Sequence, residues 1–504
     1  MRTGGAGSKT ALLATLLFGA TVIGCGGGSD TAQVPVDTGT SNPPPSGNPP
    51  PGVITPTPPA AVQGNVVFNR ATGANKDLFL IKANGTGLVT LAGDPQTSET
   101  FARVVGTRLL YHKQAIGGFA RDIWGVNLDG SAGAKIVDTA ADEYVRAVVD
   151  NVVVYEVAAT PGAQRDLWRV GIDGSDPKPI ADNANDEETM AAIVAGRVIY
   201  QQNRGGNQTD VFSVAPSGGD LQTLANSPKE EFLVGAIGTK VIIARRDDSQ
   251  SQMDLIAVEA NGQGGQVPIA ETGDNEVFVG TLGTHVLYER CAPNGGQCDI
   301  YSVDADGKNA RPVANSGDNE FFAGTVGTRV IYTRNVNGQT DLYSVEEAGG
   351  TPAPLATSNI NNEYAEGVVG SRVIFRREIG PQADLYSINA DGTGGEIAIA
   401  TGDRRESFVA AIGTRVIFER LSGGSVSSPT DILSRVADGS APEVPLATTS
   451  DNEDYRGESG GQVIYERRNA ATGDRDLFSI SPDGVGGATP LGQTANDETF
   501  VTSF

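Results

Sequence analysis

Histidine and cysteine are scarce in this chain, which has 504 residues but only two histidines and three cysteines. His112 and His285 are far apart in the sequence, and neither has a second histidine nearby. Zinc sites and most nucleophilic centres need such residues in clusters. The sequence also lacks a Gly-x-Ser-x-Gly elbow and a glycine-rich phosphate loop. We therefore predict that the protein is not an enzyme and that it needs no cofactor.

Basic residues are also few, with 37 Lys and Arg against 61 Asp and Glu and a net charge of −24. Nucleic acid binding requires clustered basic side chains, and an anionic lipid surface repels an acidic protein. The charge therefore argues against nucleic acid and against direct adsorption to a membrane. A basic protein surface or a metal cation remains an acceptable partner.

What the chain has instead is a short repeated unit, seen most clearly in residues 327–343, GTRVIYTRNVNGQTDLY. It reads as a strand, a polar turn and a second strand that opens with an aspartate. This aspartate recurs ten times, at spacings of 42 to 47 residues: Asp77, Asp122, Asp166, Asp210, Asp254, Asp299, Asp341, Asp384, Asp431 and Asp476. A period in the low forties with several short strands is typical of β-propeller blades.

One period, taken from Glu320, predicts four strands, at residues 321–326, 329–333, 341–345 and 354–356. In most repeats an Asn-Gly or Asp-Gly pair follows the third strand and supplies the positive φ angles that tight hairpins need. No long helical periodicity competes with this pattern. The hydrophobic content of 38%, low for one large core, suits thin blades that pack only on their neighbours.

The phase of the array predicts how it closes. The array begins with a second strand at residues 65–69 and ends with a first strand at residues 499–504. The last strand can therefore complete the first blade, and closure removes exposed strand edges. We predict that residues 62–504 form an all-β propeller of about ten four-stranded blades closed by the C-terminal strand. Two packed five-bladed propellers are the alternative.

The third-strand motif resembles a known family. Asp-(Leu/Ile)-aromatic-x-(Val/Ile) followed by Asp-Gly, as in residues 299–303 with 306–307, is similar to the TolB-type WD-repeat-like β-propeller. The resemblance covers about residues 62–504 and implies the fold, not a function. The Ser-Pro-Asp-Gly that usually precedes the second strand of that family is replaced by Gly-Thr-Arg or a similar triplet. The additional N-terminal domain of TolB has no counterpart, so a role in the Tol system is not implied.

Residues 1–24 look like an export signal, with a basic start and an apolar run too short to span a bilayer. Their end, VIGC at residues 22–25, resembles the bacterial lipobox, in which Cys25 is lipidated and becomes the mature N-terminus. An ordinary signal peptide with an incidental cysteine is the alternative. Residues 25–61, rich in Gly, Ser, Thr and Pro, predict a disordered linker that acts as a semi-rigid spacer.

The predicted location follows from this anchor. A lipidated Cys25 places the protein in the bacterial cell envelope, with its only membrane contact through the lipid. Gly26 stands where an aspartate is associated with inner-membrane retention in enteric bacteria. We therefore predict the outer membrane, on either its periplasmic or its outer side.

A glutamate lies seven residues before each Gly-Thr-type turn or in the last strand: Glu99, Glu143, Glu188, Glu231, Glu276, Glu320, Glu363, Glu406, Glu453 and Glu498. Because side chains alternate along a strand, we expect it on the same face as the residues two, four and six positions later. In one interpretation each glutamate is structural and accepts hydrogen bonds from backbone amides or from an arginine of the neighbouring blade. In the other, the ten form an acidic ring that binds cations such as calcium, or a basic partner segment. We favour the structural interpretation because unpaired buried carboxylates are costly.

The ten aspartates before the third strands are also expected to be structural, fixing the preceding turn. By propeller geometry both acidic rows lie towards one face. Further acids there make that face the best candidate for a ligand surface: Asp142, Asp274, Asp318, Asp403, Asp451 and Asp497. No repeat has the dense aspartate spacing of an EF-hand-type calcium loop.

Cys291 and Cys298 bracket a predicted hairpin turn in the sixth repeat. A disulfide across the hairpin is geometrically reasonable and suits an oxidising compartment. A metal site is the weaker alternative, since no other cysteine or histidine cluster is available.

Two classes of function fit these features. The first is a lipid-anchored, non-catalytic scaffold that presents an acidic face to another envelope protein. The alternative is a carbohydrate or cell-wall binding protein or, less favoured, a glycan-active enzyme. Sugar sites need flat exposed aromatic side chains, yet the only tryptophans, Trp124 and Trp168, lie in the third-strand core motif. We therefore predict a protein partner.

Overall fold

The structure is a computed structural model that describes residues 64–504, apart from 206–207, 248–251, 294, 381 and 424–427. The predicted signal segment 1–24, the predicted lipidation site Cys25 and the predicted linker 25–61 lie outside the described residues. None of the described residues forms a helix that is long and apolar enough to cross a membrane.

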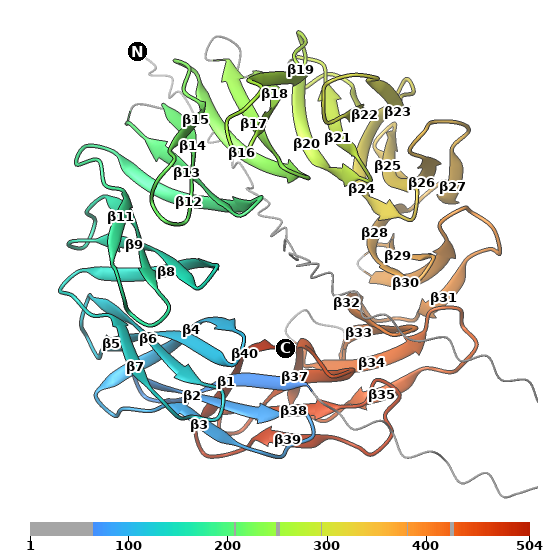
Figure 1. The fold of residues 1–504 in the computed structure, drawn as a ribbon. Coiled ribbons are helices and arrows are strands. Elements are labelled where there is room, and N and C mark those ends of the chain that lie inside the picture. The colour runs from blue at the N-terminus through green and yellow to red at the C-terminus, as the bar shows by residue number, and fades with distance from the viewer. Residues whose placement is uncertain (1–63, 206–207, 248–251, 294, 381, 424–427) are drawn as a thin grey trace, which may run out of the picture. The chain divides into compact units, whose positions relative to one another are not determined.

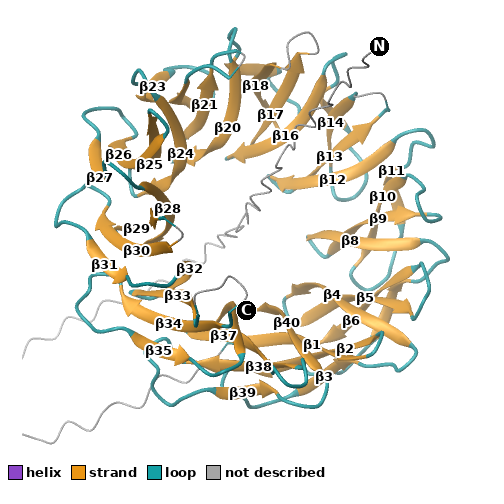
Figure 2. Cartoon of the chain, turned by 180° about the vertical axis from the view of Figure 1, so that it is seen from behind, coloured by secondary structure: helices purple, strands orange, loops and turns teal. Residues whose placement is uncertain are grey.

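The described chain folds into forty β-strands, which form ten antiparallel sheets of four strands each. The sheets are the blades of one propeller and follow one another around a single ring, with the first strand of each blade nearest the centre (Figure 1). The view from behind shows strands joined only by loops and turns (Figure 2). The prediction of an all-β propeller with ten four-stranded blades is confirmed.

The strands fall into four classes by their position in the blade. The first strands are β4 (Thr97–Val105), β8 (Asp142–Val149), β12 (Glu187–Val194), β16 (Glu230–Ile237), β20 (Asn275–Leu282), β24 (Asn319–Val326), β28 (Asn362–Val369), β32 (Glu406–Ile412), β36 (Asn452–Ser459) and β40 (Asp497–Ser503). The second strands are β1 (Asn65–Thr72), β5 (Arg108–Ala115), β9 (Val152–Ala158), β13 (Arg197–Asn203), β17 (Lys240–Asp247), β21 (His285–Cys291), β25 (Arg329–Val336), β29 (Arg372–Ile379), β33 (Arg415–Leu421) and β37 (Gln462–Arg468). The third strands are β2 (Asn75–Lys82), β6 (Arg121–Asn127), β10 (Arg165–Gly171), β14 (Thr209–Val214), β18 (Gln252–Glu259), β22 (Cys298–Asp304), β26 (Gln339–Glu346), β30 (Gln382–Asn389), β34 (Thr430–Val436) and β38 (Arg475–Ile480). The fourth strands are β3 (Val89–Ala92), β7 (Ala134–Val137), β11 (Lys178–Ala181), β15 (Gln222–Ala225), β19 (Gln266–Ala270), β23 (Arg311–Ala314), β27 (Ala353–Ala356), β31 (Ile397–Ala400), β35 (Val444–Ala447) and β39 (Thr489–Gly492).

The ring closes as predicted, because β40 pairs with β1 in the sheet of order β3-β2-β1-β40. The backbone amide of Asn65 donates to the carbonyl of Phe504 at 2.8 Å, and the amide of Phe504 donates back at 3.0 Å. The two ends of the array are therefore held together by a continuous ladder. The alternative of two five-bladed rings is not what the chain adopts.

The hydrophobic core lies between blades. One cluster combines Leu287 and Ile300 of one blade with Val330, Tyr332 and Val345 of the next. Each blade buries both faces in this way, so the low hydrophobic content is sufficient for a ring of thin sheets.

Every first strand contains a β-bulge that the sequence pattern did not reveal. In β20, Phe278 pairs with Tyr288 and Gly280 pairs with Leu287, which leaves Val279 as the extra residue. The same register shift occurs in the other nine first strands. Since Tyr288 and Leu287 are adjacent, Phe278 and Gly280 lie on opposite faces. The expectation that the glutamate shares one face with all three later positions is therefore wrong beyond the bulge.

The antiparallel order sorts the connections into two ends of the ring. We call one the loop end, where the fourth strand leads to the next first strand and where the second–third hairpins lie, as at residues 315–318 and 337–338. We call the other the turn end, with the first–second and third–fourth turns, as at residues 327–328 and 347–352. The first-strand glutamates and third-strand aspartates lie near the loop end.

Candidate functional site

All ten first-strand glutamates are buried between blades, and none has a side chain exposed by more than 1%. In seven blades the residue directly opposite on the second strand is an arginine, and in each of these an aspartate follows on the third strand. Glu320, Arg334 and Asp341 are one such set of three neighbouring residues. In these blades an arginine thus lies between the first-strand glutamate and the third-strand aspartate that the sequence analysis identified.

Six of these arginines bind the glutamate of their own blade. The Nε atoms and carboxylates are 2.8 to 3.3 Å apart in the pairs Arg70–Glu498, Arg245–Glu231, Arg334–Glu320, Arg377–Glu363, Arg420–Glu406 and Arg467–Glu453. The expectation of an arginine from the neighbouring blade is wrong, because the cross-strand register brings the two residues directly opposite each other. Arg334 also lies over the ring of Tyr343, and Arg377 over that of Tyr386, which fixes each guanidinium group.

Most of the glutamates also accept hydrogen bonds from the connection before their strand. In six blades a Ser or Thr hydroxyl four residues earlier donates to the carboxylate: Thr139, Ser227, Thr272, Ser316, Thr449 and Thr494. The backbone amides of Ser316 and Thr449 donate to the same carboxylates at 3.2 and 3.3 Å. These contacts have the geometry expected of a structural acceptor. Cation binding by the row stays a prediction, and within the described residues no three or more His, Cys, Asp or Glu are grouped as a metal site would require.

Four glutamates lack a basic partner within ion-pair distance. Glu143 faces Val157, Glu188 faces Gln202, and Arg290 turns away from Glu276 to bind Asp274 at 3.3 Å. Burial raises the pKa of each of these three glutamates to about 7. At Glu99 the opposite residue is Lys113, which binds Asp94 at 2.9 Å instead.

Six additional acids were predicted to contribute to a ligand surface at the loop end, and for Asp142 this prediction is wrong. Asp142 is only 5% exposed, and it occupies the position at which Asn319 of another blade accepts a backbone amide from the preceding blade. Asp142 accepts the amide of Arg121 at 3.2 Å and binds its guanidinium group at 2.7 Å. A carboxylate there completes the contact between two blades. Asp274, Asp318, Asp451 and Asp497 are half-buried, and Asp403 is exposed.

A second set of polar residues was not singled out by the sequence analysis. These residues lie on the second strand, one position before the residue that is opposite the first-strand glutamate. In six blades the side chain at this position accepts a backbone amide of the next blade: His112, Glu156, Gln201, Glu289, Glu419 and Glu466. The distances are 2.7 to 3.3 Å, and the donor is always the residue just before the bulge. The repeated Glu-Arg pair at residues 289–290, 419–420 and 466–467 was the available signal.

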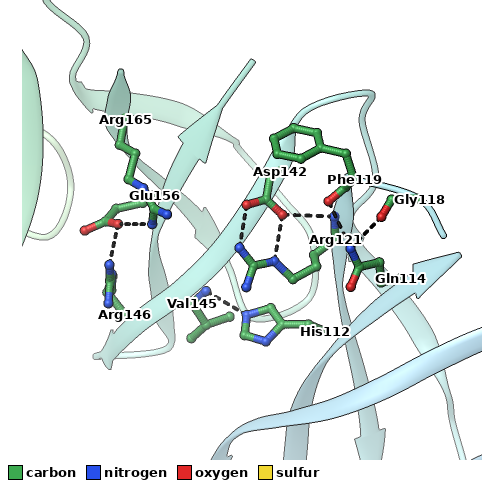
Figure 3. Close-up of polar contacts among 10 residues, drawn as sticks. All are labelled: His112, Gln114, Gly118, Phe119, Arg121, Asp142, Val145, Arg146, Glu156 and Arg165. Carbon is green, nitrogen blue, oxygen red and sulfur yellow. Dashed lines mark hydrogen bonds and ion pairs between the residues drawn. The ribbon is translucent and has the colours of Figure 1, made fainter. Parts of the chain in front are cut away.

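Figure 3 shows the polar contacts around His112, which occupies the position that Glu156 occupies in the next blade. The Nε2 atom of His112 accepts the amide of Val145 at 3.0 Å, and burial lowers the pKa of His112 to about 4. Glu156 lies between two arginines, with Arg146 at 2.6 Å and Arg165 at 3.1 Å. A cavity of about 320 Å³ lies beside this group, lined among others by Phe119, Asp142, Gln164, Arg165 and Glu187. Each charged side chain of this group binds an oppositely charged one within it, which is typical of a structural contact.

The disulfide between Cys291 and Cys298 is confirmed. The two residues lie opposite each other at the end of β21 and the start of β22, where they close a hairpin at the loop end. The predicted lipidation site Cys25 lies outside the described residues.

No protein-family profile and no curated protein matches the chain. Solved structures that resemble it include a prolyl endopeptidase, with 12% identity, a TM-score of 0.36 and coverage of 63% of this chain and 50% of that chain. They also include the tricorn protease, with 11% identity, a TM-score of 0.34 and coverage of 86% and 47%. The β-propeller domain of the Trilobed protease from Pyrococcus furiosus has 15% identity, a TM-score of 0.32 and coverage of 60% and 97%. The chain spans about half the length of the first two proteins. The likeness concerns the propeller fold alone, and no activity is carried over.

Proposed function

We propose that the protein is a lipid-anchored, TolB-type β-propeller of the bacterial cell envelope that serves as a non-catalytic scaffold for another envelope protein. The observation that carries the proposal is the location of the charge. In the first 63 residues Arg2 and Lys9 balance Asp30 and Asp37, so the propeller bears the whole net charge of −24. An acidic body of this kind attracts a basic protein surface and accelerates its association.

The loop end is the part of the propeller that we assign to the partner. Asp318 and Asp403 lie in connections that lead to first strands, and Asp274 and Asp451 occupy the same position in two other blades. Apolar side chains also reach the surface on consecutive first strands, with Val277 39% and Phe321 40% exposed. Apolar contacts beside acidic loops suit a protein partner.

The tryptophans support a protein partner over a glycan. Trp124 is half-buried, and the ammonium groups of Lys113 and Lys135 lie over its ring at 4.9 and 5.6 Å. Trp168 is also half-buried and packs against the core between two blades. Neither ring is presented as an open platform for a sugar.

One feature favours the glycan alternative. A cavity of about 370 Å³ at the loop end is lined mainly by glycines and by polar side chains that suit hydroxyl groups, namely Gln297, Asp318, Asn319, Asn335 and Asn337. A sugar bound there would lose affinity on Asn337→Ala substitution, and a glycan array measures this directly.

The scaffold proposal is tested by cross-linking in intact native cells, followed by pulldown and mass spectrometry. We expect one stoichiometric envelope protein, and we expect its recovery to fall at least tenfold with the triple variant Asp274→Asn, Asp318→Asn and Asp451→Asn. The matched control is Asp306→Asn, Asp391→Asn and Asp438→Asn, which removes the same charge at the turn end. Asn84 and Asn261 occupy the corresponding turn position in other repeats, so this control should fold. Equal recovery with both triple variants, or recovery of polysaccharide alone, would contradict the proposal.

A further inference from the structure

The cavity of about 370 Å³ at the loop end lies where three connections of two neighbouring blades meet. The β21–β22 hairpin supplies Gly296 and Gln297, the connection before β24 supplies Gly317 and Asp318, and the β25–β26 hairpin supplies Asn337. Glycines form much of its lining, so a ligand can approach the backbone closely. The chemistry of the few side chains that remain decides what the cavity can bind.

Asp318 is the charged residue among those that line the cavity. In the described part of the chain, no Lys, Arg or His side chain lies within ion-pair distance of its carboxylate. Asp274, which occupies the same position in the preceding blade, binds Arg290 at 3.3 Å. Because Asp318 is half-buried, its charge is less screened by water than that of an exposed aspartate. A cation that enters the cavity therefore meets a carboxylate without a competing partner.

Two amide side chains of the cavity have already used N–H groups within the protein. Both N–H groups of Gln297 donate, one to Asp299 at 2.8 Å and one to the carbonyl of Ser316. The Nδ2 atom of Asn335 donates to Thr340 at 3.4 Å. These side chains thus offer a ligand mainly their oxygen atoms. Guanidinium and ammonium groups carry only donors and match such a lining, whereas a sugar hydroxyl also needs donors from the protein.

We propose that this cavity binds the side chain of an arginine or lysine of a partner protein, with Asp318 as its counter-ion. The inference rests on the proposed scaffold function, because the partner protein supplies the basic side chain. Phe321 provides the adjoining apolar contact. It lies two residues after Asn319, which lines the cavity, on the same face of β24, and it is 40% exposed. The partner segment therefore carries an apolar residue beside the basic one.

The disulfide holds one part of the cavity lining in place. Cys291 and Cys298 close the hairpin of residues 292–297, part of which lines the cavity. The backbone amide of Cys298 also donates to the Oδ1 atom of Asn319 at 2.9 Å, which joins this hairpin to the connection that carries Asp318. A cavity whose parts are fixed before binding loses less conformational entropy when the ligand arrives. The disulfide, which the scaffold proposal leaves without a role, thus contributes to recognition.

The test uses the full chain and two synthetic peptides. One is acetyl-Leu-Arg-Leu-amide, and the other has citrulline, the neutral isostere of arginine, in the middle position. Saturation-transfer difference NMR at low salt measures their dissociation constants. Asp318→Asn should weaken binding of the arginine peptide by about tenfold, the equivalent of one charge-assisted hydrogen bond, and should remove its advantage over the citrulline peptide. The matched control Asp306→Asn removes the same charge at the turn end and should leave binding unchanged.

A second pair of variants tests the cavity by its volume. A Cβ added to Gly317 meets nothing within 4 Å, so Gly317→Leu should fold and should block the arginine peptide. Gly273 occupies the same position in the preceding blade, and a Cβ there also meets nothing within 4 Å. Gly273→Leu is therefore the matched control and should bind the arginine peptide as the unmodified protein does.

Three results would overturn the proposal. The first is equal binding of the arginine peptide to all four variants, which would show attraction by the overall charge alone. The second is the absence of any preference for arginine over citrulline. The third is binding of chitotriose, a neutral sugar probe, that is lost in Gly317→Leu while the arginine peptide does not bind, which would make the cavity a glycan site.

The cell cross-linking experiment separates this proposal from the scaffold proposal. If the peptides fail but the partner protein is still recovered and still depends on the three loop-end aspartates, the basic side-chain pocket is wrong and the scaffold proposal stands. If the arginine peptide binds as expected but no envelope protein is recovered, the pocket stands and the scaffold proposal is wrong.

Discussion

Polar side chains buried between blades determine how neighbouring blades are held together. His112, Gln201 and Glu289 occupy equivalent positions on three second strands, and each accepts a backbone amide of the next blade at 2.7 to 3.3 Å. The β-bulge disturbs the ladder beside that amide, so a side-chain acceptor satisfies it. At these three positions the same contact is made by an acceptor atom of three different residue types.

Where the acceptor is His112, the contact depends on pH, because a protonated imidazole can no longer accept the amide. Burial lowers the pKa of His112 to about 4 from an ordinary value of 6.5, and the nearby Arg121 and Arg146 act in the same direction while Asp142 opposes them. The unfolded chain therefore takes up a proton below pH 6.5 that the folded protein accepts only near pH 4. The stability present above pH 6.5 is lost as the pH falls through 4, by up to about 3 kcal/mol.

We predict that His112→Gln removes this acid sensitivity. Gln201 shows that a glutamine at this position accepts the amide of the next blade, so Tm at pH 7 should change little. The fall in Tm between pH 7 and pH 5 should become smaller than in the unmodified protein. The reciprocal variant Gln201→His should increase that fall, and an unchanged pH dependence in both variants would count against the argument.

At the level of the strand, the bulge decides which residues face which neighbour. Position four after each glutamate lies on the face opposite the glutamate, towards the following blade. A Cβ added to Gly367 would lie 2.4 Å from a ring carbon of Phe408, and one added to Gly235 would lie 2.5 Å from Phe278. A small residue at this position therefore allows neighbouring blades to pack closely.

We predict that Gly367→Ala lowers stability by about 1–3 kcal/mol, because the added methyl group overpacks the interface with Phe408. Denaturant unfolding measures this loss. Gly273→Ala is the control, since a Cβ there meets nothing within 4 Å. The double variant Gly367→Ala with Phe408→Leu should recover part of the loss, and an equal effect of Gly367→Ala and the control would contradict the packing argument.

For the whole molecule, stability depends on a closed ring. The C-terminal strand β40 pairs with β1, places Glu498 on Arg70 at 2.8 Å, and packs Phe500 against the cluster of Val66 and Phe68. Without β40 the edge of β1 would be open, and an open edge promotes association with other strands.

We predict that deletion of residues 497–504 lowers the free energy of unfolding by at least about 2 kcal/mol, roughly the contribution of one buried aromatic side chain. It should also produce association that light scattering detects. Deletion of Phe504 alone removes the two backbone bonds to Asn65 and should have a much smaller effect. A monomeric protein of unchanged Tm after the longer deletion would show that closure is unimportant.

The sequence by itself determined the repeat, the four strands of each blade, the closure by the last strand and the hairpin disulfide. These features depend on neighbours in the chain: strand periodicity, Asn-Gly and Asp-Gly turns, and two cysteines seven residues apart. The observed strands β24 to β27 contain the predicted ranges and extend beyond them by one to three residues, most at the hairpin through Asn337, which continues to the pair of Val336 and Gln339.

The tertiary structure decided the partner of each buried charge. Whether a glutamate meets an arginine, a glutamine or a valine depends on cross-strand register, and the bulge changes which face each later residue occupies. The contacts of Asp142 and the acceptor role of His112 depend on backbone amides and a guanidinium group of a neighbouring blade. The residues that make these contacts stand at positions of the repeat that occur in every blade. The sequence pattern alone therefore could not assign their side chains to one face of the blade or the other.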